Sequence, residues 1–119
     1  MGALVRGTIA FAPGGGPVRD AAVRVKVEEI RGADAPAKPA GSTVLEHVSL
    51  DAPAGATSIP FTVWVETVDP AAEYNVRVHV DVDGTGRIGP EDYLSTSSER
   101  VLTHGNPSEA HVVVRPTRR

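Results

Sequence analysis

The stretch that decides the fold is Tyr74-Asn75-Val76-Arg77-Val78-His79-Val80-Asp81-Val82, residues 74–82. Apolar side chains alternate strictly with polar ones along it, and this period of two is typical of a β-strand with one buried and one solvated face. The apolar positions are mostly valine, which is stiff at χ1 and packs well on a pleated surface. The stretch therefore predicts a strand that covers a core with one face only.

The same alternation recurs, with varying clarity, in six further stretches of the chain. Residues 43–50 and 94–102 are the weakest, because Glu46 interrupts one apolar face and hydroxyl residues fill the other stretch. Between the stretches lie Gly- and Pro-rich turns, and 31–39 is predicted to be a crossing loop because its prolines exclude a helix interior. The inward faces expected in the remaining stretches are Val5, Gly7, Ile9 and Phe11; Val23, Val25 and Val27; Val44, Val48 and Leu50; Ile59, Phe61, Val63 and Val65; and Ala110, Val112 and Val114.

Seven short strands without a helical period predict an all-β fold. Each strand has one apolar and one polar face, so two layers are needed to hide the apolar faces from water. We expect a seven-stranded antiparallel Greek-key sandwich. The length of 119 residues suits one domain, residues 1–119.

Composition excludes several classes of protein. The net charge of -3 does not provide the broad basic surface of a nucleic-acid-binding protein. The chain contains no Cys, so disulfides and thiol nucleophiles are excluded. We expect no transmembrane segment, because no apolar run reaches about 18 residues, and no signal peptide, because Arg6 and Thr8 interrupt the first apolar stretch. These features leave the compartment open.

The segment Asp81 to Asp92 resembles the calcium loop of EF-hands. Oxygen-bearing residues alternate along it, and Gly86 stands where such loops turn sharply. Calcium prefers a shell of oxygen ligands, and a tight turn brings alternate residues inward around the ion. The predicted calcium ligands are Asp81, Asp83, Thr85, Arg87 (through its carbonyl oxygen) and Asp92.

Three features of this segment depart from that pattern. Asp92 replaces the longer Glu that normally binds with both oxygens, and Pro90 stands at position ten. A β-strand rather than a helix leads into the loop. The alternative is a plain hairpin turn, because Asp83-Gly84 is a strong turn signal and Asp, Thr and Gly satisfy turn backbones by themselves. Both interpretations remain open from the sequence.

Other candidate residues carry weaker signals. A zinc site from His79 and His111 would require their strands to be neighbours; solvated histidines are the alternative. The hydroxyls of Ser95 to Ser98 lack the surroundings of a nucleophile and suit an exposed edge strand. Trp64 falls on an outward face, where it marks either a recognition surface or a covered sheet edge. We therefore predict no enzymatic activity.

The order of these strands resembles the YbaY/YscW-type lipoprotein family, which includes type III secretion pilotins. The resemblance spans about residues 4 to 115, and its more particular parts are the loop Ala33-Asp34-Ala35-Pro36 and the strand start Pro60-Phe61. It implies an Ig-like or prealbumin-like β-sandwich in the bacterial cell envelope, whose relatives act as chaperone or pilot for a membrane secretion component or have no known role. The chain departs from the family in having no lipobox Cys.

Two functions follow as expectations. The first is a non-catalytic binding or chaperone-like module that holds an unknown protein partner through a sheet face or edge strand, as a monomer or weak dimer. The second is a structural domain stabilised by calcium at residues 81–92, where an ion would reduce the entropy of a long loop.

Overall fold

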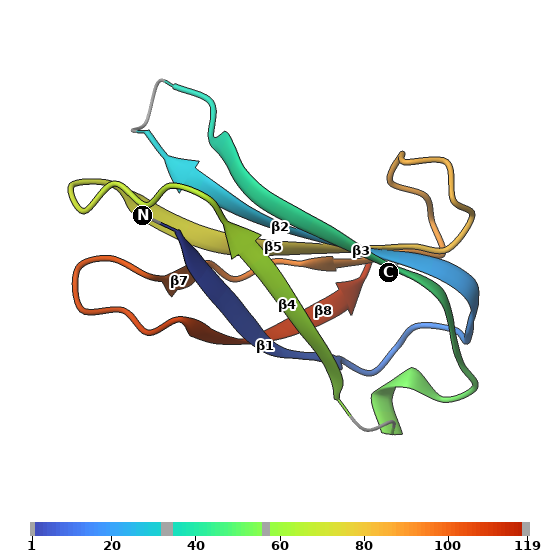
Figure 1. The fold of residues 1–119 in the computed structure, drawn as a ribbon. Helices are drawn as coiled ribbons and strands as arrows, with labels where there is room; N and C mark the ends of the chain where they lie inside the picture. Colours follow the sequence, from blue (N-terminus) through green and yellow to red (C-terminus); the bar gives the residue numbers. More distant parts are fainter. Residues whose placement is uncertain (1, 32–34, 56–57, 118–119) are drawn as a thin grey trace.

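The computed structural model describes residues 2–31, 35–55 and 58–117, and their regular structure is almost entirely β (Figure 1). The strands are β1 (Ala3–Phe11), β2 (Val18–Ile30), β3 (Lys38–Leu50), β4 (Ile59–Val65), β5 (Glu73–Asp81), β6 (Tyr93–Ser95), β7 (Glu99–Val101) and β8 (Glu109–Pro116). One short 3-10 turn, η1 (Pro53–Gly55), precedes β4. The described residues contain no helix long and apolar enough to cross a membrane. The all-β prediction is confirmed.

The strands form one mixed sheet in the order β3-β2-β5-β6-β8-β1-β4, with β7 pairing to β5. The sheet folds over on itself, so that β1 and β4 lie in front and run at a steep angle to β2, β3 and β5 in Figure 1. Its two ends meet where Gly41 of β3 lies against Trp64 of β4. A Cβ atom at Gly41 would lie 2.4 Å from the Trp64 carbonyl oxygen, so this approach requires glycine. The result is a nearly closed barrel.

The predicted seven-stranded antiparallel Greek-key sandwich was wrong in its architecture, because the strands form one nearly closed sheet instead of two stacked sheets. Two further details also differ from the prediction. First, β1 and β8 run parallel, from Arg6 beside Glu109 to Phe11 beside Val114. Second, residues 94–102 form two short strands, β6 and β7, rather than one. Both pair with β5, but between them the Val78 N–H donates to the Ser95 hydroxyl at 2.9 Å, which interrupts the backbone ladder.

The connection at 31–39 also differs from the prediction. Glu29 of β2 pairs with Lys38 of β3 in an antiparallel register, so the connection closes a long hairpin instead of crossing the barrel. Within β3 the inward face changes phase: Val44 is exposed, whereas Leu45, Val48 and Leu50 pack against the core. The irregularity lies near His47, which has a φ of 57°, and such a bulge shifts the alternation by one residue.

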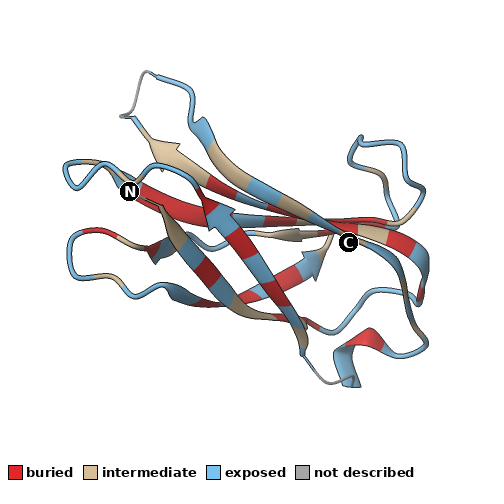
Figure 2. Ribbon diagram, in the orientation of Figure 1, coloured by how far each residue is buried: buried red, intermediate tan, exposed pale blue. Residues whose placement is uncertain are grey.

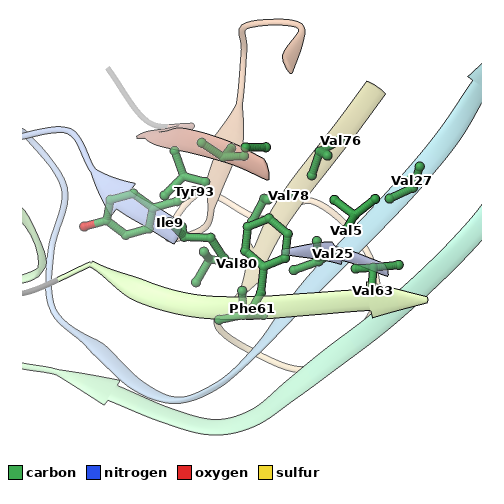
Figure 3. Packing of buried hydrophobic residues seen from close by; sticks show 14 of the residues in the cluster. Val5, Ile9, Val25, Val27, Phe61, Val63, Val76, Val78, Val80 and Tyr93 are labelled. Carbon is green, nitrogen blue, oxygen red and sulfur yellow. The ribbon is translucent and has the colours of Figure 1, made fainter. Parts of the chain in front are cut away.

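The barrel interior confirms most of the predicted inward faces. Red buried bands alternate with exposed ones along β1, β4 and β8 (Figure 2), and valines from both layers meet around Phe61 and Ile9 (Figure 3). Gly7 also belongs to this face, because a Cβ there would lie 2.8 Å from the Phe61 ring and 1.9 Å from the Ala110 carbonyl oxygen. Tyr93 closes one end with an edge-on contact to Phe11, ring centroids 4.9 Å apart.

Candidate functional site

The longest polar excursion from the barrel is the segment 82–92, between β5 and β6, which projects beyond the sheet in Figure 1. A carboxylate stands at each end of it. Asp81 is the last residue of β5, Asp92 comes directly before β6, and both are buried. Because a buried carboxylate must be compensated, the partners of these two residues show what the segment is built to do.

Asp81 accepts bonds from four N–H groups. Its Oδ2 accepts from Arg24 Nε at 3.1 Å, Arg24 Nη2 at 3.0 Å and Gly86 N at 2.8 Å, while Oδ1 accepts from Gly84 N at 3.1 Å. Burial alone raises the pKa of Asp81, but the hydrogen bonds from Gly86 and Arg24 outweigh it and hold the pKa below its usual range. Asp81 therefore stays ionised and ties the tip of the segment to β2.

Asp92 fixes the other end of the segment. Its Oδ1 accepts from Val82 N at 3.0 Å, and its Oδ2 accepts from Gly89 N at 3.0 Å and lies 2.7 Å from His79 Nε2. The Asp92 carboxylate thus links the first residue of the segment, Val82, to Gly89 near its end. His79 shares the outer face of β5 with Asp81, as their spacing predicted.

At the exposed tip of the segment, polar groups form hydrogen bonds with one another. Asp83 Oδ1 accepts from Thr85 N at 3.2 Å and Thr85 Oγ1 at 2.9 Å, and Thr85 Oγ1 accepts from Arg87 N at 3.2 Å. Gly84 and Gly86 have φ of 74° and 80°, which side chains with a Cβ rarely adopt. These are the hydrogen bonds of a turn.

Two of the five predicted calcium ligands lie in one cluster. Among the described residues, His79, Asp81 and Asp92 offer ligand atoms within 4.8 Å of one another. One imidazole with two carboxylates is a donor set that suits zinc as well as calcium. An ion there would compete with the Arg24 guanidinium for Asp81. Calcium binding at 81–92 stays a prediction.

The zinc site considered for His79 and His111 is not formed. Their strands, β5 and β8, are separated by β6, and His111 Nδ1 lies 2.8 Å from the Thr8 hydroxyl on the outer face of β1. The serine stretch likewise serves the fold: Ser95 accepts from the β5 backbone, and the Ser98 hydroxyl accepts from the Asn75 and Arg100 side chains.

Sequence reasoning missed Arg24 as the partner of Asp81. The two residues lie 57 positions apart and meet only because β2 pairs with β5, which brings Ala22 opposite Asp81 and Arg24 opposite His79. No local pattern signals this partnership. The alternation around Arg24 showed only that its side chain lies on the outer face of β2.

A second candidate surface lies on the outside of β1 and β4. Trp64 is 58% exposed and Leu4 is 38% exposed, and the two residues are directly opposite in the β1–β4 register. β4 pairs with β1 on one edge, and β3, at the other end of the sheet, approaches it where Gly41 lies against the Trp64 carbonyl oxygen. The prediction that Trp64 points outward is confirmed. An exposed tryptophan beside an exposed leucine forms an apolar patch of the kind found on protein-binding surfaces.

Comparisons with known proteins support the fold. No family model matches the sequence, and no curated protein matches it. Among solved structures, the fold is similar to that of an alternative pilotin from the type II secretion system of Vibrio cholerae, with a TM-score of 0.77 over 100% of both chains and 16% sequence identity. This confirms a pilotin-like fold; at this identity the likeness extends to the fold alone. Membership of the YbaY/YscW family stays a prediction, and part of its loop signature, Ala33-Asp34, lies outside the described residues.

Proposed function

We propose that this chain is a non-catalytic, single-domain binding module of the bacterial cell envelope, which holds a protein partner on the outer face of β1 and β4. The observation that carries the proposal is the exposed Trp64, placed directly opposite the exposed Leu4 on the outer face of β1 and β4. A partner that packs on this face would bury the Leu4 side chain, and the indole would supply an aromatic anchor. The pilotin-like fold supports the proposal.

The test is affinity capture from a bacterial envelope extract, followed by mass spectrometry, with three forms of the protein. Wild type and Trp64→Ala are compared with Val113→Ala. This control truncates another exposed apolar side chain, which lies on β8 and not beside Trp64. We expect one partner that the wild type and Val113→Ala retain and Trp64→Ala loses. Capture that does not depend on Trp64, or no capture at all, would contradict the proposal. Sedimentation should show a monomer or weak dimer without the partner.

A second candidate function is a structural domain stabilised by calcium. It is favoured by the buried carboxylates of Asp81 and Asp92, which lie together at the two ends of the segment 82–92. A bound ion would then stabilise the folded state by mass action, by about 2.7 kcal/mol at a calcium concentration 100-fold above Kd.

Thermal unfolding with and without millimolar calcium tests this candidate. We expect a higher Tm with calcium in the wild type and no rise in Asp81→Ala. Asp83→Ala locates the ion: loss of the rise places it in an EF-hand-like loop, and a retained rise places it in the buried cluster of His79, Asp81 and Asp92. An unchanged Tm in the wild type identifies the segment as a turn.

A further inference from the structure

The outer face of β2 and β5 carries a pocket of about 320 Å³ beside the segment 82–92. Its floor is formed by the two strands, and Ile88 of the segment and Leu94 of β6 stand at its sides. This volume lies at the lower end of the range for small-molecule sites, which are concave, largely apolar and contain a few placed polar groups. The pocket lies apart from Trp64, on a different pair of strands.

The titratable side chains of this pocket are all basic. Arg24, Lys26, Arg77 and His79 line it, and no acidic side chain of the described residues does. The chain as a whole has a net charge of -3, so this local excess of positive charge opposes the overall composition. The β2–β5 register produces it, because Lys26 lies directly opposite Arg77 and Arg24 directly opposite His79.

Two like charges placed opposite each other on a sheet destabilise it unless something compensates them. Arg77 is compensated in part by Glu28, whose Oε1 lies 2.8 Å from Arg77 Nε, and Arg24 by the buried Asp81. Lys26 forms no ion pair with any residue that the structure describes. Its ammonium group therefore leaves one positive charge in the pocket uncompensated.

The carboxylates behind the two arginines also orient them. Arg24 bonds to Asp81 through Nε and Nη2, and Arg77 contacts Glu28 through Nε. Each guanidinium retains N–H groups that make no hydrogen bond within the described part of the chain. A guanidinium held in this way loses less side-chain entropy when it binds a further anion. His79, whose Nε2 contacts Asp92, is already engaged within the protein.

The sides of the pocket are apolar. Ile88 is 64% exposed and Leu94 is half-buried, and both residues line the pocket. An anion that carries an apolar body would contact both kinds of surface, which inorganic ions cannot do.

We propose that this pocket binds a small organic carboxylate, with the carboxylate group held by Lys26 and the two arginines and the apolar body against Ile88 and Leu94. The site is independent of the protein partner proposed above. It lies on the opposite layer from Trp64, so both ligands can bind at once.

The test is a titration of the whole protein with sodium hexanoate, followed by amide proton–nitrogen correlation spectra at constant ionic strength. Sodium acetate and inorganic phosphate serve as probes that lack the apolar body. We expect saturable shifts at residues 77–79, 86–88 and 94–95, with hexanoate binding more tightly than either smaller anion. Lys26→Gln should weaken hexanoate binding by about tenfold, because it removes a charged hydrogen-bond donor.

Lys38→Gln is the matched control, because Lys26 and Lys38 are the two lysines of the chain and Lys38 lies at the hairpin end of β3, outside the pocket. It should leave hexanoate binding unchanged. Equal weakening by both variants would show a general charge effect and overturn the proposal, as would the absence of saturable shifts. Phosphate binding as tightly as hexanoate would overturn the role given to Ile88 and Leu94.

Discussion

The barrel interior and the segment 82–92 are held by different kinds of interaction. The interior is made of valines and a few larger apolar side chains, each contributing through the area that it removes from water. The segment has no such core, and two buried carboxylates and their N–H partners fix its shape. Apolar side chains can pack together in many orientations, because their attraction has no preferred direction. A hydrogen bond, in contrast, requires a defined distance and angle between donor and acceptor. The interior therefore supplies stability, and the segment supplies a defined surface.

The sharpest test of this difference is a cavity in the interior. Phe61→Ala removes a ring that is 3% exposed, packed against Gly7 between the two layers. We expect the free energy of unfolding to fall by about 3–5 kcal/mol, measured by urea denaturation. Thr62→Ala, the exposed neighbour on β4, should change it by less than about 0.5 kcal/mol. Similar losses in both variants would mean that the alternation of β4 does not separate core from surface.

A smaller effect is expected where the segment meets the barrel. Arg24→Met removes the only charged donor to the buried Asp81 among the described residues, so the carboxylate keeps the backbone donors alone. We expect the free energy of unfolding to fall by about 2 kcal/mol. The loss is moderate because Arg24 is partly exposed, so that water can replace some of the lost contact.

Arg19→Met provides the control for that measurement, since it breaks the exposed ion pair with Asp51, and the expected change is below about 0.5 kcal/mol. If Arg19 and Arg24 proved equally dispensable, Asp81 would be adequately held by Gly84 and Gly86.

Acid should loosen the segment through Asp81. Its folded-state pKa lies below the unfolded value of about 3.9, because hydrogen bonds from Gly86 and Arg24 outweigh the effect of burial. The ionised group therefore stabilises the fold above about pH 4, and this stabilisation is lost as the pH falls through the folded-state pKa. Asp81→Asn should flatten the dependence of Tm on pH below about pH 4. An unaltered slope would assign the acid sensitivity to other carboxylates.

The smallest effect belongs to the exposed pair of His47 and Asp20. A hydrogen bond and the charge of Asp20, 2.6 Å away, raise the pKa of His47 above its usual value. The stabilisation is complete below about pH 6.5 and is lost as the pH rises through the folded-state pKa. His47→Gln should remove a small decrease of Tm between about pH 6 and pH 8. A decrease that persists in this variant would show that the pair contributes nothing.

Much of the fold could be predicted from local pattern. Strict alternation located β1, β2, β4, β5 and β8 and their buried faces, because side chains on a strand point to opposite sides in turn. The pattern was misleading in β3, where the bulge at His47 moves Leu45 inward and Val44 outward. A bulge leaves no apolar signature, since it depends on how one strand fits its neighbour.

The candidate site could be predicted only in part. The segment Asp81 to Asp92 stood out by its composition. Asp83 and Thr85 form the hydrogen bonds of a turn at Gly84, as one of the two interpretations of the sequence expected. The partners of the buried carboxylates and the basic pocket could not be predicted, because Arg24 and Lys26 come from β2 and meet β5 through a pairing of distant strands.

By itself, the sequence determined that the chain forms strands, which faces of most of them are apolar, and where the acidic turn lies. Those properties depend on neighbouring residues and on the two-residue period of a strand. Only the tertiary structure decided that β1 and β8 run parallel, that the sheet closes at Gly41 and Trp64, and that basic residues of β2 and β5 share one pocket. Strand order and register are set by packing between residues far apart in the chain, and a local period of two fits many such arrangements equally well.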